Sequence, residues 1–537
     1  SFNEAIRLKP DYFEAYNNLG NAFKEQGREN EAVEQFQISI RLNPEYEVAH
    51  NNLANLLKDI GRPDEAVGYY QSAVKLKPDF AEAYFNLGAA FIALDNYNKA
   101  VEQYRRAIKL KPDYADAYNN LGNILKKQKK YNDAVLHYKK AIAVKSDFAE
   151  AYNNLGDAYR LQGRLDEALE LCRKATRLQP YNEKFYVNFG NTLYDRGDFQ
   201  EAERQFQKAI NLKPDFADAH FNKGIALLLR SEFEKGWREY EWRFQSREIS
   251  QNIGYRNTDI PVWDGSMLNG KTILVRSEQG LGDHIQFVRY MPVLKERGGR
   301  VVFECRKELM RLFEDYTGID ILIEESRSNE SVPAPDVCVQ LLNLPSILNT
   351  TLDTIFADVP YLRVATEAVS KWRSKIDGKA FKVGLAWSGN PAHKNDHNRS
   401  CRFSDFTPMG NVPGVAFYSL QKEGIDENDE LCSAMHVKDI GRYLDDFHDT
   451  AAVIENLDLV ISVDTSVVHV AGALGKPVWT LLPFVPDWRW MLEREDTPWY
   501  PTMRLFRQPA YGDWKSVINK VADELRKQVQ LKGATNE

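Results

Sequence analysis

The N-terminal half of the chain repeats with a fixed period. Turn residues recur every 34 positions, at Pro10, Pro44, Pro78, Pro112, Ser146, Pro180 and Pro214. The residues before each turn also recur, as Tyr16, Leu19, Gly20, Phe23, Ala32 and Phe36 in one unit and Tyr84, Leu87, Gly88, Phe91, Ala100 and Tyr104 two units later. A fixed period of this length predicts stacked helical pairs, because one pair cannot bury its own apolar face.

This spacing is the pattern of the tetratricopeptide repeat. Small residues such as Gly20 and Ala32 let two helices approach, aromatic residues fill the space between pairs, and proline ends the second helix. We expect an α-helical superhelix over residues 1–247, with about seven repeats of which the first is truncated. Because the chain opens at Ser1 inside a repeat, we also expect that the natural N-terminus is missing.

One polar position of the array carries asparagine in every unit, although core packing does not require it. It lies on the first helix of each pair, which lines the concave face of such superhelices. A carboxamide both donates and accepts, so it can hold an extended peptide acceptor without reading its side chains; alternatively, it bonds locally between helices. This asparagine ladder comprises Asn18, Asn52, Asn86, Asn120, Asn154, Asn188 and Asn222. The array resembles the repeat region of O-linked N-acetylglucosamine transferase, where such a ladder holds substrate.

The last helical pair departs from the repeat pattern. Its second helix carries Trp237, Tyr240 and Trp242, which are too many aromatic residues for a helix that faces solvent. We therefore expect this helix to dock on the following domain. A linker is expected over residues 248–261.

The C-terminal half alternates short apolar strands with helical stretches. Strands are expected at residues 271–276, 301–303, 382–386, 416–420, 457–462 and 477–482, and a helix at residues 284–296. This alternation predicts parallel βαβ units in two facing Rossmann-like lobes, 262–366 and 367–530, followed by a tail at 531–537. Ligands of open parallel sheets lie beyond the carboxyl ends of the strands, so the cleft between the lobes is the expected donor site.

Composition excludes several classes of protein. The net charge of -7 is modest and the charges are interspersed, which argues against a nucleic-acid binder. The chain has no Walker loop, no dinucleotide fingerprint and no cysteine–histidine spacing for metal, so neither a cofactor nor a metal site is expected. Five scattered cysteines fit reduced thiols, and no apolar run is long enough to span a membrane. A cytoplasmic location is expected.

Polar motifs follow the expected strands of both lobes. The first is EQGLGD at residues 278–283, where two glycines allow a tight turn before a helix. The second is the loop WSGNPAHKNDHNRS at residues 387–400, and the third is the strand-to-helix step SVDTSVVH at residues 462–469, whose free N–H groups suit an anion. A fourth, LQKE, begins at Leu420 and can meet a base or a ribose.

Residues 262–525 resemble the heptosyltransferase family of inverting, metal-independent glycosyltransferases, which have the two-lobed GT-B fold. The matching strings include EQGLGDHIQFVRY, GLAWSGNPAHKNDHNRS, SLQKE and DLVISVDTSVVHVAGALGKPVW. The chain also resembles bacterial proteins that join tetratricopeptide repeats to such a domain, some of them linked to flagellin glycosylation. Where those heptosyltransferases have a glycine-rich turn after the last strand, this chain has FVPDWRW at residues 484–490, which leaves the sugar open.

The resemblance implies a general base at Asp283, a lysine near the donor phosphates at Lys394, and a donor-binding helix start. The full set of expected donor-binding residues is Gln279, Gly282, Asn390, Lys394, Arg399, Gln421, Asp464, Thr465, Ser466, His469 and Arg489. Arg489 enters this set because its planar guanidinium suits phosphate.

Each assignment has a structural alternative. Asp283 and Asp464 can be helix caps, Lys394 and Arg399 can be solvated surface charges, and His469 can be a hydrogen-bonded core histidine. The aromatic residues Trp488, Trp490, Trp499 and Tyr500 suit packing between lobes better than sugar stacking.

The leading hypothesis is a glycosyltransferase that moves a sugar from a nucleotide-sugar donor to a protein held by the repeat groove, with Asp283 as base. One alternative is a non-catalytic adaptor whose transferase-like domain only binds. Another is a transferase that acts on glycans, with the repeats recruiting a partner.

Overall fold

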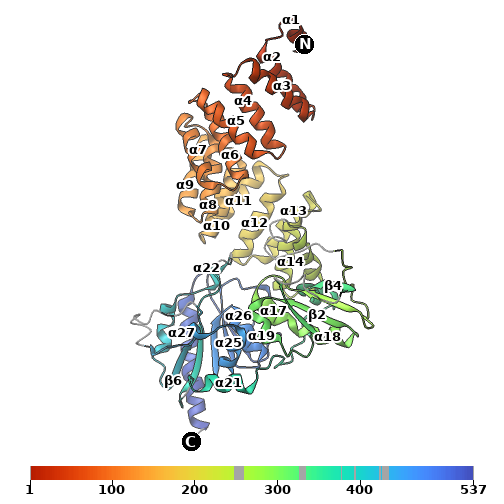
Figure 1. Cartoon of the computed structure of the whole chain (residues 1–537). Coiled ribbons are helices and arrows are strands. Elements are labelled where there is room, and N and C mark those ends of the chain that lie inside the picture. Colours follow the sequence, from red (N-terminus) through yellow and green to blue (C-terminus); the bar gives the residue numbers. More distant parts are fainter. Residues whose placement is uncertain are drawn as a thin grey trace. The chain divides into compact units, whose positions relative to one another are not determined.

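In the computed structural model the chain forms two compact units, Ser1–Thr192 and Leu193–Glu537 (Figure 1). The structure describes residues 2–246, 259–325, 334–376, 378–391, 393, 395–422, 425 and 435–535. Most of the expected linker at 248–261 therefore lies outside the described residues. None of the described helices has both the length and the apolar character needed to cross a bilayer.

The N-terminal unit consists of stacked antiparallel helix pairs, as the repeat predicts. The chain enters it in a second helix, α1, and the pairs α2/α3 to α10/α11 follow. The helices are α1 Phe2–Leu8, α2 Phe13–Glu25, α3 Glu29–Leu42, α4 Glu47–Asp59, α5 Pro63–Leu76, α6 Ala81–Ala93, α7 Tyr97–Leu110, α8 Ala115–Lys127, α9 Tyr131–Val144, α10 Ala149–Leu161 and α11 Leu165–Leu178. The next helix, α12 Glu183–Arg196, runs across the division between the units.

The glycines of the repeat permit close packing of the two helices in each pair. A Cβ atom on Gly20 would lie 2.7 Å from the ring of Phe36, and one on Gly88 would lie 2.9 Å from the ring of Tyr104. These rings belong to the second helix of the same pair and are fully buried. The expected role of the small positions is therefore confirmed, whereas the rings of Phe36 and Tyr104 fill space within a pair and not between pairs as expected.

The C-terminal unit begins with helices of the repeat type and continues into two α/β lobes. Its first helices are α13 Phe199–Leu212, α14 Ala217–Leu229 and α15 Phe233–Tyr240, followed by the 3-10 helix η1 Glu241–Phe244. The N-terminal lobe has β1 Thr272–Arg276, α17 Leu281–Phe287, α18 Met291–Glu296, β2 Arg300–Cys305, α19 Met310–Phe313, β3 Ile321–Glu324, β4 Val337–Gln340 and α20 Leu344–Ile347.

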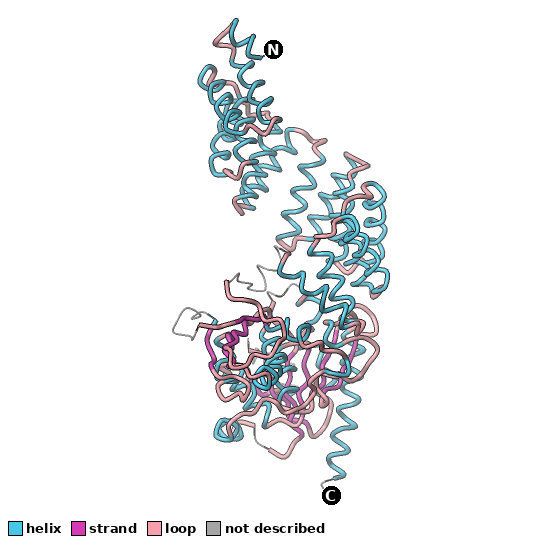
Figure 2. The backbone as a smooth tube through the Cα atoms, turned by 90° about the vertical axis from the view of Figure 1, so that its right-hand side faces the viewer, coloured by secondary structure: helices cyan, strands magenta, loops and turns pink. Residues whose placement is uncertain are grey.

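The C-terminal lobe begins with helix α21. Its elements are α21 Thr366–Arg373, β5 Phe381–Ala386, α22 Asp396–Arg399, α23 Thr407–Gly410, β6 Val415–Ser419, β7 Lys438–Asp439, α25 Phe447–Glu455, β8 Leu459–Val463, α26 Ser466–Ala473, β9 Val478–Leu482, β10 Met503–Arg507 and α27 Trp514–Thr535. The named strands all lie in the C-terminal unit, where they are magenta in Figure 2.

Each lobe contains one sheet whose named strands all pair in parallel. The strand order is β3-β2-β1-β4 in the N-terminal lobe and β10-β9-β8-β5-β6-β7 in the C-terminal lobe. In the second sheet the chain proceeds outward from β5 to β7 and then returns to β8 beside β5. The strand order therefore reverses between β5 and β8, where parallel sheets open a crevice for ligands. The expected superhelix followed by two Rossmann-like lobes is confirmed.

Helix α15, the second helix of the last repeat pair, packs into the N-terminal lobe. Its Trp237 is 3% exposed and donates its indole N–H to the carbonyl of Thr350 at 3.0 Å. Trp237 also meets Trp488 of the C-terminal lobe edge to face, with ring centroids 5.1 Å apart. The aromatic residues of α15 therefore belong to the core of the C-terminal unit, which confirms the expected docking of this helix.

Candidate active site

A cavity of about 330 Å³ lies at the point where the strand order of the second sheet reverses. Ala386 at the end of β5 and Leu420 after β6 line it, together with Thr465 and Ser466 after β8. The N-terminal lobe contributes Leu281 of α17 and Glu308. The cavity therefore opens at the carboxyl ends of parallel strands and is shared by both lobes.

Four of the expected donor residues line this cavity, namely Asn390, Gln421, Thr465 and Ser466. Thr465 has the extended backbone of an N-cap, and its hydroxyl lies 3.2 Å from that of Ser462. Ser466 opens α26, whose first turn presents N–H groups without partners inside the helix and the positive end of its dipole. A phosphate group is the chemical class that such a helix start holds best.

Gln421 fixes the loop after β5. Its side-chain oxygen accepts a hydrogen bond from the backbone amide of Ser388 at 3.2 Å. The backbone amide of Gln421 donates to the hydroxyl of Ser419, also at 3.2 Å. The Gln421 side chain is 7% exposed and lines the cavity. It therefore joins the ends of β5 and β6 at the cavity wall.

Arg399 lies behind the loop and is absent from the cavity wall. Its Nη1 donates to the carbonyl of Asp464 at 3.3 Å, and a Cβ on Gly389 would come within 2.6 Å of its Nη2. Arg399 thus ties the 387–400 loop to the segment before α26. The expected phosphate lysine, Lys394, lies outside the described residues.

An ion pair between Asp283 and Arg489 connects the two lobes. Arg489 donates from Nη2 to Asp283, from Nε to Gln286 at 2.8 Å, and from Nη1 to Asp487 at 2.8 Å. The other oxygen of Asp283 accepts from the amide of Gly280 at 2.7 Å. The expected base and the expected phosphate arginine are therefore partners of each other, and neither lines the cavity.

The pKa of Asp283 is raised above its usual value. Burial is the largest cause, and it outweighs the opposing effects of the Arg489 guanidinium and the Gly280 amide. Asp283 is the third residue of α17, and its hydrogen bond to Gly280 makes it part of the helix start. The helix begins at Leu281, three residues earlier than predicted, which makes Asp283 a capping residue. The same carboxylate forms the ion pair with Arg489 between the lobes.

His469 is a buried residue of the interface between the lobes. Its Nδ1 is 2.9 Å from the hydroxyl of Tyr500, and its ring stacks on Trp490 with centroids 5.4 Å apart. Burial, followed by the charges of Arg489, Arg289 and Arg399, holds the pKa of His469 well below its usual value. The ring is therefore neutral at physiological pH.

Gly282 of α17 lies directly against His469. A Cβ atom on Gly282 would be 2.7 Å from Cδ2 of His469, and α17 and α26 lie side by side (Figure 1). The aromatic residues around them, Trp488, Trp490, Trp499 and Tyr500, are at most 2% exposed. These rings form the packed core between the lobes.

Asp464 precedes the N-cap of α26 and has an unusual acidity. Burial, with repulsion from Asp487, raises the pKa of Asp464 to about 6. The N-cap position itself belongs to Thr465. Asp464 is therefore a buried carboxyl group of raised pKa beside the helix start, and it is neither the N-cap nor part of the cavity wall.

Gln279 adopts a left-handed backbone, with φ at 64°. Its side-chain amide donates to the hydroxyl of Tyr240 on α15 at 2.7 Å, and its carbonyl accepts from Arg306 at 2.9 Å. The structure thus places the side chain of Gln279 against the last repeat helix, and the cavity wall does not include it.

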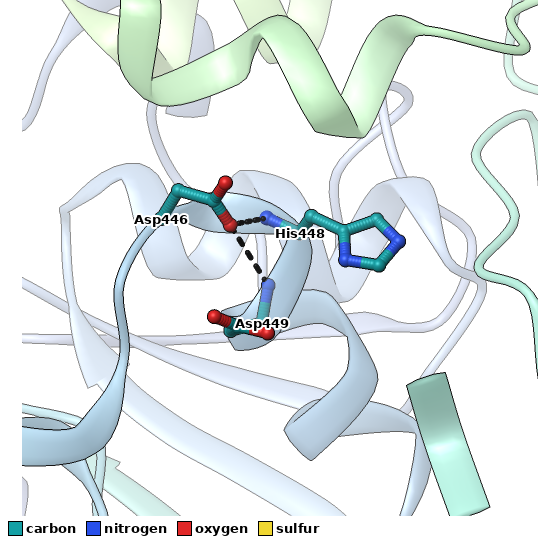
Figure 3. Close-up of side chains that lie close together, drawn as sticks. All are labelled: Asp446, His448 and Asp449. Atoms are coloured by element: carbon teal, nitrogen blue, oxygen red, sulfur yellow. Dashed lines mark hydrogen bonds between the residues drawn. The ribbon is translucent and has the colours of Figure 1, made fainter. Parts of the chain in front are cut away.

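A cluster of Asp446, His448 and Asp449 was not among the sequence candidates (Figure 3). Its three potential ligand atoms lie within 4.8 Å of one another. Arg311 of the N-terminal lobe contacts all three, at 3.0, 3.1 and 3.6 Å respectively, and Asp446 caps α25 through the amides of the other two. The cluster is therefore an interlobe ion-pair site at the cavity, since Asp446 lines it. The strand-to-helix position of DDFHD, at residues 445–449, is the signal that could have revealed it.

The asparagine ladder bonds between successive repeats of the N-terminal unit. The side-chain amides of Asn52, Asn86, Asn154 and Asn188 donate to the side-chain oxygens of Asn17, Asn51, Asn119 and Asn153, at 3.0 to 3.2 Å. The acceptors are buried, whereas the donors are half-buried. The amide groups therefore stabilise the stack, and each donor keeps a carboxamide oxygen with which to accept from a bound backbone.

Comparisons with known proteins also distinguish a repeat region from a glycosyltransferase segment. The model of the cilia and flagella-associated protein 70 C-terminal domain, which is of the tetratricopeptide type, matches residues 6–224. The model of glycosyltransferase family 9 (heptosyltransferase) matches residues 421–485, from Gln421 through α26 to β9. A tetratricopeptide region and a segment of the heptosyltransferase type thus occur in one chain, as the sequence motifs predict.

Protein FlbA of Caulobacter vibrioides is 28% identical over 289 residues. The match covers 49% of this chain and 48% of FlbA, so the chain spans about half the length of this curated relative. Among solved structures, MamA is 30% identical over 32% of this chain and 94% of its own, with a TM-score of 0.29. YrrB, described as a tetratricopeptide protein with an unusual peptide-binding site, is 26% identical over 35% of this chain and 96% of its own, with a TM-score of 0.30.

Proposed function

We propose that the chain is a glycosyltransferase that moves a sugar from a nucleotide-sugar donor to a protein acceptor recruited by the repeats. The observation that carries this proposal is the cavity of about 330 Å³ at the reversal of strand order, with the start of α26 at its wall. That helix start lies in the segment matched by the family 9 model. Its N–H groups suit the diphosphate of a donor, and Gln421 and Asn390 suit its polar base or ribose.

The proposed reaction is an inverting displacement without metal. Asp283 accepts the proton of an acceptor hydroxyl as that oxygen attacks the anomeric carbon, and the nucleoside diphosphate departs toward the start of α26, with Lys394 as the proposed phosphate lysine. Both oxygens of Asp283 already accept one hydrogen bond each. Each still has a second lone pair with which to receive the acceptor proton, and the raised pKa of this carboxyl improves it as a base.

The protein acceptor is the second part of the proposal. The half-buried ladder amides leave their oxygens available to an extended peptide, and the similar protein YrrB is described as having a peptide-binding site. Buried thiols at Cys172, Cys305, Cys338 and Cys401, together with a nucleotide-sugar donor, fit a cytoplasmic location.

Two variants separate the proposed roles. Asp283→Asn should abolish sugar transfer and leave donor affinity nearly intact, whereas Lys394→Ala should weaken donor binding. Donor affinity is measured by calorimetry and transfer by mass spectrometry of the acceptor. Unchanged turnover in Asp283→Asn would remove it as the base. Donor binding without any transfer to protein or glycan acceptors would favour a non-catalytic adaptor.

A further inference from the structure

The last repeat helix reaches the turn that carries the proposed base. Arg243 of η1 is fully buried and forms a two-pronged ion pair with Glu278, at 3.0 Å from Nε and 2.7 Å from Nη2. Glu278 is 3% exposed and also accepts from the amide of Leu342 at 3.1 Å. Because a buried charge is stable only with a partner, this pair fixes the start of the 278–283 turn.

The next residue of the turn, Gln279, contacts Tyr240 of α15. Gln279 has a left-handed backbone, a conformation that costs free energy and persists only where surrounding contacts impose it. The hydroxyl of Tyr240 accepts from its side chain at 2.7 Å. Gln279 is followed by Gly280, whose amide binds Asp283. The contacts from α15 and η1 thus end one residue before the group that positions the carboxylate.

The same helix also supports the partner of Asp283 in the other lobe. Trp237 and Tyr240 pack edge to face on Trp488, with centroids 5.1 and 6.3 Å away. The guanidinium of Arg489 lies over the Trp488 ring at 4.4 Å. Both members of the Asp283–Arg489 pair are therefore linked to side chains of α15 and η1 through neighbouring residues, Asp283 through the 278–280 turn and Arg489 through Trp488.

We infer that α15 and η1 form part of the transferase site, with Arg243 and Tyr240 as positioning residues for Asp283. This inference rests on the proposed function only in naming Asp283 as the base. It implies that the transferase lobes need the last repeat helix in order to hold the turn.

Hydrogen exchange of the whole chain tests the positioning without any assay of activity. Tyr240→Phe removes a single hydroxyl and keeps the ring packing, so the fold should survive. Amides of residues 279–284 should exchange about tenfold faster or more in Tyr240→Phe, while amides of α27 keep their rates. Arg238→Met is the matched control, because Arg238 is on α15 but its side chain is 77% exposed. Equal exchange of the turn in Tyr240→Phe and wild type would overturn the inference.

Arg243 is tested with its partner neutralised as well. Arg243→Met alone leaves Glu278 buried and unpaired, so the double variant Arg243→Met with Glu278→Gln is made in parallel. Both should speed exchange of residues 279–284, and neither should change the exchange of α27. An unchanged turn in the folded double variant would contradict the role of Arg243.

Turnover provides the second readout. With an active wild type, Tyr240→Phe should lower kcat about tenfold with an unchanged KM for the donor, and its pH profile should shift because Asp283 has moved. A full kcat in this variant would refute the positioning role. Wild-type protein that transfers no sugar would instead refute the proposed function, and the exchange measurements would still decide the inference.

Discussion

The substitution Gly282→Ala adds one methyl group where α17 meets α26. The new Cβ would lie 2.7 Å from Cδ2 and 3.2 Å from Nε2 of His469. Carbon atoms in contact prefer about 3.5 to 4.0 Å, so one side must move by about 1 Å. The His469 ring cannot easily move away, because it is hydrogen-bonded to the Tyr500 hydroxyl and stacked on the Trp490 ring. Tyr500 in turn lies against Gly472, where even a Cβ would come within 2.5 Å of its ring.

The methyl group should therefore push α17 away from α26. Overpacking of this kind costs about 1 to 3 kcal/mol, and replacing a helical glycine returns up to about 1 kcal/mol. We expect a net loss of about 1 to 2 kcal/mol in the free energy of unfolding of the C-terminal unit. Asp283 adjoins Gly282, so turnover should fall by up to about 100-fold, the effect of a displacement near 1 Å.

Urea unfolding monitored by tryptophan fluorescence measures this loss directly. All 10 tryptophans lie at or after Trp237, so their emission reports the C-terminal unit. Gly68→Ala on α5 is the matched control, because a Cβ there meets no atom within 4 Å, and circular dichroism should show a more stable repeat unit. Adding His469→Ala to Gly282→Ala should cost less than the sum of the two single changes. A stable Gly282→Ala protein, or strict additivity, would refute the steric reasoning.

Three further predictions concern other residues. The folded-state pKa of Asp464, about 6, lies above its unfolded value, so the native state binds more protons between about pH 4 and 6 and loses stability as pH rises through that window. Asp464→Asn should remove this loss and stabilise the C-terminal unit by about 1 to 3 kcal/mol at pH 7.5 but by less at pH 4.5. The same shift of the urea midpoint at both pH values would contradict this prediction. Gln421→Ala frees the amide of Ser388 at the cavity wall and should weaken donor binding about tenfold, as calorimetry would show; an unchanged affinity would exclude Gln421 from the donor site. Asn153→Ala leaves the Asn188 amide without its acceptor and should cost the repeat unit about 1 to 2 kcal/mol, measured by circular dichroism, whereas no loss would mean that the ladder bonds do not stabilise the stack.

The repeat array could be predicted almost completely from the sequence. Its contacts are local, and the spacing of Gly20 and Phe36 places them in one helix pair. The strands β1, β5, β8 and β9 were also predictable within two residues, because most of their residues are apolar and buried. The strands β3, β4, β7 and β10 were missed; β7 has only two residues, and β10 is interrupted by Arg504.

The sequence motifs could not predict which side chains from distant parts of the chain contact each other. Asp283 and Arg489 are 206 positions apart, and nothing in either motif indicates that the two side chains bind each other. The motif around Gln279 indicated a tight turn, but only the packing of α15 shows that its side chain faces Tyr240. A motif identifies residues with the right chemistry, whereas their partners depend on how distant segments pack.

The most direct test of the account is binding and turnover of nucleotide sugars by the whole chain. The cavity at the start of α26 predicts that one donor from a panel will raise the melting temperature of the C-terminal unit by several degrees when present at about 100 times its Kd. The same donor should then yield nucleoside diphosphate and a glycosylated protein with wild type, and only the thermal shift with Asp283→Asn. A panel without any thermal shift or sugar transfer would contradict the account.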